Sequence, residues 1–251
     1  MNQVANSETL NSDWKSLYRV GGVAALIAGV LFRRNIAAEI GLFSKHSSPV
    51  TVGDWFALLQ SNRLFGLAYL NIFDVVNYAF VSLMFLALYV VLSRSNKSYM
   101  IIATTLGLVG IAVYFASNTA FSMLSLSNQY TASTTEIQRT MLLSAGEALL
   151  AINRFASPGA HPGSGGYMSL FLVAIAVMIT SIVMLRSDVF NRITAYVGIL
   201  ASTFDLAYCI VFVFIPTIDS ELLAVIFIPA AGLFLMIWHI MVGWRLYQLG
   251  K

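Results

Sequence analysis

The stretch Tyr167-Met-Ser-Leu-Phe-Leu-Val-Ala-Ile-Ala-Val-Met-Ile-Thr-Ser-Ile-Val-Met-Leu185 contains 19 residues and no charged side chain. A hydrocarbon core of about 30 Å needs about 20 helical residues per crossing, so this stretch has the length and composition of a transmembrane helix. Its apolar residues are continuous and do not alternate with polar ones, which excludes a strand of a membrane barrel.

Five further stretches have the same character, and together they predict an all-α, polytopic transmembrane bundle of about six spans. Helices satisfy their backbone amides internally, as lipid requires. A polar cytoplasmic tail, residues 1–16, precedes a single transmembrane helical domain, residues 17–251. The expected spans are 17–43, 67–92, 99–124, 167–185, 193–215 and 222–247.

Composition supports the same fold class. The 251 residues are 59% hydrophobic and 10% charged, with a mean hydropathy of +0.81, whereas soluble domains are near half apolar and a quarter charged. The net charge is only +3 and no basic run exists, so nucleic acid is excluded as an expected partner. The only cysteine is Cys209, so an intramolecular disulfide cannot form.

The basic residues predict the orientation, because Lys and Arg near the ends of spans stay cytoplasmic. If the N-terminus lies inside the cell, the outer loops hold few basic residues, so both termini are expected inside the cell. If Arg33 and Arg34 marked the cytoplasmic end of the first span instead, this asymmetry would shrink. With the N-terminus inside, the cytoplasmic side receives Lys15, Arg19, Arg94, Lys97, Arg186, Arg192, Arg245 and Lys251.

The connection between the third and fourth spans, residues 125–166, is too long for a simple turn. Ser133 and Glu136 have the spacing of a capping box, which marks a helix start. We therefore expect an amphipathic helix over about 134–154 in this outer loop, ended by the Gly- and Pro-rich residues 157–166. Apolar residues recur there at helical spacing, namely Ile137, Met141, Ala145 and Leu149.

Polar residues inside the expected spans carry most of the functional information. An ionisable group in a transmembrane helix costs roughly 2.5–3.5 kcal/mol on insertion scales, so such groups usually face the bundle interior and find partners. Depth along the helices predicts an ion pair between Asp74 and Arg33 or Arg34. The candidate ligand-binding residues are Arg33, Arg34, Glu39, Asn71, Asp74, Asn118, Asp205 and His239.

Helical spacing places these polar residues on stripes with small or aromatic side chains. Small residues allow close helix approach in lipid, so the stripes are either packing seams or the lining of a polar cavity. The stripes are Asn71, Asp74 and Tyr78; Gly110, Tyr114 and Asn118; Gly198, Ser202, Asp205 and Cys209; and Gly232, Met236, His239 and Gly243.

Three functions remain open on this evidence. A polar cavity in the outer half containing Arg33 and Arg34 would suit a small polar or anionic ligand, to be bound or transported, because guanidinium groups bind carboxylates and phosphates bidentately. Asp205 and His239 could instead form the acid and base of an intramembrane enzyme. The chain could also be a structural or accessory membrane subunit. No catalytic, cofactor or metal-binding motif is present, so no catalytic residue, cofactor or metal is assigned, and the oligomeric state stays undetermined.

Four stretches resemble the prokaryotic membrane family called domain of unknown function 4386. This resemblance covers most of the chain and implies a multi-pass protein of a bacterial or archaeal cell membrane, without an assigned activity, cofactor or catalytic residue. The stretches are Gly21-Gly-Val-Ala-Ala-Leu-Ile-Ala-Gly-Val-Leu-Phe-Arg-Arg-Asn35, Asn71-Ile-Phe-Asp-Val-Val-Asn77, Ala116-Ser-Asn-Thr-Ala-Phe-Ser-Met-Leu-Ser-Leu-Ser-Asn-Gln-Tyr130 and Trp244-Arg-Leu-Tyr-Gln-Leu-Gly250.

Overall fold

The computed structural model describes residues 14–31, 49–152, 163–215 and 220–251, and the regular structure within these ranges is helical. The prediction of an all-α fold is confirmed for this part of the chain. An N-terminal helix occupies residues 14–31. The helices that follow are α2 (Val52–Ser61), α3 (Arg63–Tyr69), α4 (Ile72–Ser117), α5 (Ala120–Ala132), α6 (Glu136–Ile152), α7 (Ser164–Leu185), α8 (Arg192–Phe214) and α9 (Ser220–Leu249).

Helix α4 folds back on itself and forms two arms, residues 72–95 and 97–117. A straight helix of its 46 residues would be about 69 Å long. Asn96 interrupts it with an extended backbone, φ −157° and ψ 95°, and its side chain accepts a hydrogen bond from the Tyr99 amide at 3.1 Å. The Tyr114 hydroxyl near one end reaches the Asn71 carbonyl near the other at 3.3 Å. The two arms therefore lie side by side.

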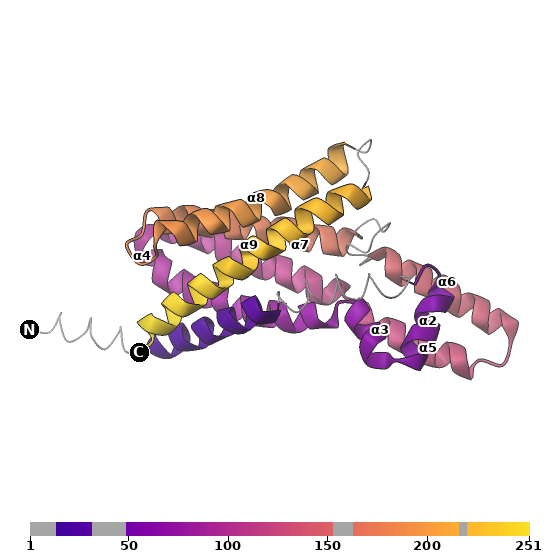
Figure 1. Ribbon diagram of the computed structural model, residues 1–251. Helices are drawn as coiled ribbons and strands as arrows, with labels where there is room; N and C mark the ends of the chain where they lie inside the picture. The colour runs from indigo at the N-terminus through magenta and orange to yellow at the C-terminus, as the bar shows by residue number, and fades with distance from the viewer. Residues whose placement is uncertain (1–13, 32–48, 153–162, 216–219) are drawn as a thin grey trace, which may run out of the picture.

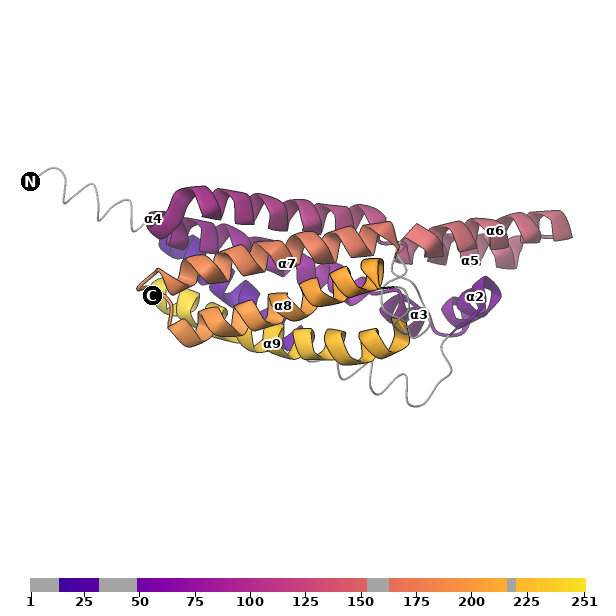
Figure 2. The ribbon, with the colours of Figure 1, turned by 90° about the horizontal axis from the view of Figure 1, so that it is seen from above.

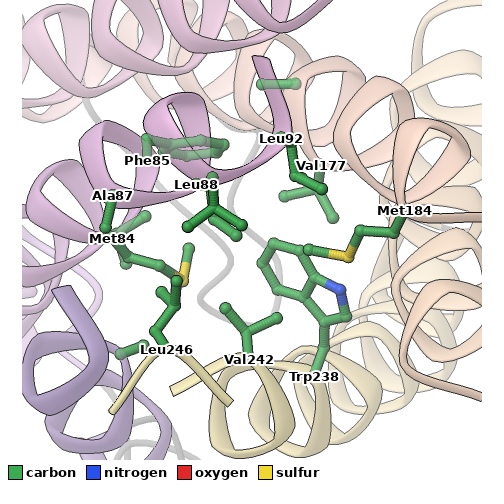
Figure 3. Close-up of a cluster of buried hydrophobic side chains, with 14 of the residues drawn as sticks. Met84, Phe85, Ala87, Leu88, Leu92, Val177, Met184, Trp238, Val242 and Leu246 are labelled. Carbon is green, nitrogen blue, oxygen red and sulfur yellow. The ribbon is translucent and has the colours of Figure 1, made fainter. Parts of the chain in front are cut away.

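The two arms of α4 pack with the N-terminal helix, α7, α8 and α9 into an elongated bundle (Figures 1 and 2). The core contains large side chains from α4, α7 and α9, and Figure 3 shows Trp238 of α9 pointing in among them. Fully buried members of this core are Met84, Phe85, Leu88, Leu92, Met184, Trp238, Val242 and Leu246.

The bundle has the thickness of a bilayer. Helix α7 has 22 residues and α8 has 23, which correspond to about 33 and about 35 Å. Within the described residues, four stretches are long and apolar enough to cross a membrane, and the first contains both arms of α4 together with α5. They are Ile72–Ala132, Ser164–Leu185, Arg192–Phe214 and Ile226–Leu249. The expected first span, 17–43, lies partly outside the described residues.

Helices α2, α3, α5 and α6 gather beyond one end of the bundle, opposite the C-terminus, and we call these four helices the cap (Figures 1 and 2). The cap has its own apolar cluster, which includes Trp55, Phe56 and Met123. The buried hydroxyl of Ser127 on α5 donates to the Phe56 carbonyl on α2 at 3.0 Å and accepts from the side-chain amide of Gln60 at 2.9 Å. The cap is therefore a packed layer, with polar contacts between its helices.

Two expected helix boundaries are corrected by the structure. The expected span 67–92 is broken at Asn71, which adopts a left-handed conformation with φ 60° and ψ 35°. The expected span 99–124 is broken at Asn118, which has φ −66° and ψ 125°. Apolar residues such as Leu70 and Met123 continue past both breaks because they are buried in the cap, so hydropathy alone does not detect where the helices end.

Helix α2 begins at a reciprocal capping box outside the bundle. The Thr51 hydroxyl accepts from the Asp54 amide at 3.2 Å, and the Asp54 carboxylate accepts from the Thr51 amide at 2.9 Å. Hydrogen bonds from the Thr51 backbone and side chain lower the pKa of Asp54 below its usual value. The carboxylate therefore favours the folded first turn of α2.

We expect this first turn to fray as the pH falls. Because the pKa of Asp54 is lowered on folding, its contribution is present above the unfolded value of about 3.9 and is lost as the pH falls through the folded value. Amide hydrogen exchange at Thr51 and Asp54 should accelerate, relative to intrinsic rates, at acidic pH. Asp54→Asn should remove this pH dependence, and an unchanged profile in that variant would contradict the assignment.

Candidate functional site

The two helix breaks lie against each other where the cap meets the bundle. The Asn118 side-chain amide donates to the Leu70 carbonyl at 3.3 Å, and its oxygen accepts from the Ala120 amide at 3.1 Å. The Tyr114 hydroxyl donates to the Asn71 carbonyl at 3.3 Å. Side chains near one break thus satisfy backbone carbonyls at the other, as interrupted helices in a membrane protein require.

Asp74 joins this junction from the first turn of α4. The Tyr114 hydroxyl also approaches its Oδ2 atom, at 3.5 Å. The structure therefore brings together three of the sequence-predicted site residues, Asn71, Asp74 and Asn118, around the hydroxyl of Tyr114. An acidic side chain here lies beside the start of a helix, where negative charge is favoured.

Tyr78 extends the polar region one helical turn deeper into the bundle. Its ring centroid is 4.6 Å from that of Tyr114, and it interacts electrostatically with both Asp74 and Asp205. Neither Tyr78 nor Tyr114 was among the predicted site residues, although both lie on the predicted polar stripes. Their position on the same helical faces as Asp74 and Asn118 was the signal that could have identified them.

Asp205 approaches this region from α8. Its side chain is buried, 7% exposed, and interacts electrostatically with Cys209 one turn further along α8 as well as with Tyr78. The Tyr167 hydroxyl on α7 donates to the Cys209 carbonyl at 3.2 Å. Tyr78 thus lies within electrostatic range of Asp74 on its own helix and of Asp205 on α8.

His239 has a different environment on α9. It is buried, and its Nδ1 atom lies 2.7 Å from the Leu235 carbonyl of its own helix. Its Cβ atom is next to Gly29 of the N-terminal helix. Within the described part of the chain, these contacts do not join His239 to Asp205, so they give the acid and base hypothesis no geometric support.

Arg33, Arg34 and Glu39 lie outside the described residues. The ion pair between Asp74 and one of these arginines therefore stays a prediction. In the ranges that the structure describes, no group of three His, Cys, Asp or Glu side chains could hold a metal ion.

Long apolar helices packed into a bundle of bilayer thickness, with the Asp205 carboxyl group buried among them, define a multi-pass transmembrane protein. The chain belongs to the family described as domain of unknown function (DUF4386), whose sequence profile matches residues 16–243, nearly its whole length. The resemblance seen in the sequence is therefore confirmed. Neither a curated protein nor a solved structure matches the chain.

Proposed function

We propose that the chain crosses a prokaryotic cell membrane six times, with both termini in the cytoplasm. The spans would be the predicted first span, residues 17–43, the two arms of α4, and α7, α8 and α9. The distribution of basic residues supports this orientation, because the start of the N-terminal helix, the C-terminus, the α4 turn and the α7–α8 turn lie at one end of the bundle (Figure 1). The cap, with α6 as its outer-loop helix, would then lie outside the cell.

Within this topology we infer that the bundle binds a small polar solute, and that it does so as part of transport. The observation that carries this inference is the carboxyl group of Asp205, which is only 7% exposed on the apolar helix α8. A carboxylate at this depth costs roughly 2.5–3.5 kcal/mol on insertion scales, and helix packing alone does not require one. Intramembrane ionisable groups of this kind commonly mark solute or ion pathways.

The paired helix breaks add support for a solute site near the cap. Transporter sites are often built where helices are interrupted near a polar region, because unwound backbone supplies additional hydrogen-bonding groups. The breaks at Asn71 and Asn118 adjoin Asp74, so carboxylate, hydroxyl, amide and backbone groups converge there. Such a set suits a solute that both donates and accepts hydrogen bonds. Arg33 and Arg34, if they reach the same depth, would extend the choice to anionic solutes.

A thermal-shift screen of purified protein against polar metabolites tests this proposal. A solute at about one hundred times its Kd should stabilise the wild-type protein by about 2.7 kcal/mol. Asp205→Asn keeps the shape of the side chain and should abolish the shift. The matched control is Asp188→Asn, since Asp188 is exposed in the α7–α8 connection.

Two outcomes would count against the proposal. The first is a broad screen in which no solute stabilises the wild-type protein. The second is a solute that stabilises Asp205→Asn as strongly as wild type. For a solute that binds, uptake into proteoliposomes by wild type but not by Asp205→Asn would establish transport, and binding without uptake would limit the function to binding.

A further inference from the structure

The end of the bundle that holds the C-terminus and the start of the N-terminal helix carries a cluster of exposed basic residues, and we call it the basic end. Arg94 and Lys97 flank the break in α4, and Arg186 and Arg192 flank the connection between α7 and α8. All four are exposed, and the acidic side chain that accompanies them in the described part of the chain is Asp188. The surface is therefore strongly cationic.

Two other arginines at the basic end have structural roles and are not part of this surface. The Arg19 guanidinium donates to the Gly250 carbonyl at 3.1 Å, which holds the C-terminus to the N-terminal helix. Arg245 donates through Nε to the Val189 carbonyl at 2.7 Å, which holds α9 to the α7–α8 connection. The exposed charges on the two turns are separate from these contacts.

A layer of exposed amphipathic aromatic residues adjoins the basic residues. Tyr99 is 51% exposed and Tyr196 is 56% exposed, and each follows a basic residue, Lys97 or Arg192, by about one helical turn or less. Trp244 near the end of α9 is also 56% exposed. Tyr and Trp side chains concentrate at the level of lipid headgroups, where the ring is in the apolar phase and the polar atom is hydrated.

The opposite end of the bundle exposes aromatic residues of another kind. Phe73 at the start of α4, Phe115 near its end and Phe214 at the end of α8 are all more than a third exposed. Phenylalanine lacks the polar atom that favours the headgroup layer. The amphipathic rings and the exposed positive charges thus coincide at one end.

The two turns at the basic end also have the same local design. Asn96 accepts from the Tyr99 amide at 3.1 Å, and Asn191 accepts from the Ile193 amide at 3.1 Å, so an asparagine side chain caps the helix that begins at each turn. The basic residue that follows each cap, Lys97 or Arg192, is thereby fixed at the rim of the bundle. The tyrosine further along each helix is fixed on its lipid-facing side.

We propose that the basic end is a binding surface for anionic phospholipid headgroups. Arg94 and Lys97 on one turn and Arg186 and Arg192 on the other bind the phosphate groups, while the adjoining acyl chains lie along Tyr99 and Tyr196. Anionic lipid attracts basic groups near the membrane surface, and the exposed rings select a phosphate that is attached to an acyl chain. A free phosphate ion shares the first interaction but not the second.

The test measures how lipids change the thermal stability of the full chain in detergent micelles. Phosphatidylglycerol should raise the unfolding temperature, whereas equimolar phosphatidylcholine and inorganic phosphate should leave it nearly unchanged. The rise should shrink in 0.5 M salt by about half or more, since salt screens exposed charges. Equal stabilisation by the two lipids, or full stabilisation by inorganic phosphate, would overturn the proposal.

Paired charge-removing variants locate the surface. Lys97→Gln combined with Arg192→Gln should weaken phosphatidylglycerol binding about tenfold or more, measured by lipid retention in native mass spectrometry. The matched control, Arg63→Gln with Arg139→Gln, removes two charges from the cap and should retain lipid like wild type. An equal loss in both double variants would contradict the assignment. The comparison of lipids on the wild-type chain does not depend on either variant folding.

Discussion

Replacing Trp238 with alanine is expected to lower the free energy of unfolding by about 3–5 kcal/mol. Trp238 is among the largest side chains in the fully buried core of the bundle, and Figure 3 shows it among Leu88, Val177, Met184 and Val242. Removal of the indole leaves a cavity that the surrounding helices fill only in part. Thermal unfolding of the purified protein in detergent should show this loss as a large fall in the unfolding temperature.

The same helix provides a matched control. Trp244 lies six residues further along α9 and is 56% exposed. Trp244→Ala should therefore change the free energy of unfolding by only about 0.5 kcal/mol in detergent. Trp238→Phe keeps an aromatic ring in the core and should fall between the two alanine variants. Similar losses in Trp238→Ala and Trp244→Ala would show that Trp238 does not hold the core together.

The transmembrane class of this protein could be predicted from sequence because lipid imposes a simple requirement. An apolar run bounded by polar or glycine-rich residues must be helical, and the run 167–185 ends at the same Leu185 as α7. The expected span 193–215 likewise differs from α8 by one residue at each end. Where the apolar run and the helix end together, hydropathy gives the boundary.

The breaks at Asn71 and Asn118 could not be predicted in this way, because the apolar run continues into a second environment. Leu70 and Met123 are buried among the cap helices beyond the end of the bundle. Hydropathy reports burial but does not distinguish lipid from the interior of a folded cap. The left-handed backbone of Asn71 gives only a weak local signal, because asparagine tolerates this conformation but is also found inside helices, as Asn77 is in α4.

Part of the candidate site followed from helical spacing. Asp74 and Asn118 lie on predicted stripes, and in the structure both lie at the helix breaks around Tyr114. Spacing on one helix fixes which residues share a face, but it does not fix which neighbouring helix that face meets. This is why the contacts of His239 with the Leu235 carbonyl and with Gly29 of the N-terminal helix could not be predicted from its stripe.

Gly243, one of the two glycines on the last predicted stripe, has a packing role, and it leads to the second large effect. Gly243 of α9 crosses Gly22 of the N-terminal helix at backbone contact. A Cβ atom added to Gly243 would lie 2.8 Å from the Gly22 carbonyl oxygen and 2.8 Å from the Leu26 amide nitrogen. A Cβ atom added to Gly22 would lie 2.5 Å from the Tyr247 amide nitrogen. Small residues permit this approach in lipid, where dispersion contacts between helices replace the hydrophobic effect.

Gly243→Ala is therefore expected to lower the free energy of unfolding by about 1–3 kcal/mol, and Gly243→Val by more, because backbone atoms cannot move aside as a flexible side chain can. Gly22→Ala should have a similar effect. The double variant should lose less free energy of unfolding than the sum of the two single variants, because both changes separate the same two helices.

Gly53→Ala is the control, since its added Cβ atom meets only the Thr51 hydroxyl at 3.6 Å. That variant should be neutral or slightly stabilised, as alanine favours a helix. Thermal unfolding in detergent measures all five variants, and a Gly243→Ala protein as stable as wild type would show that the two helices do not cross at this glycine.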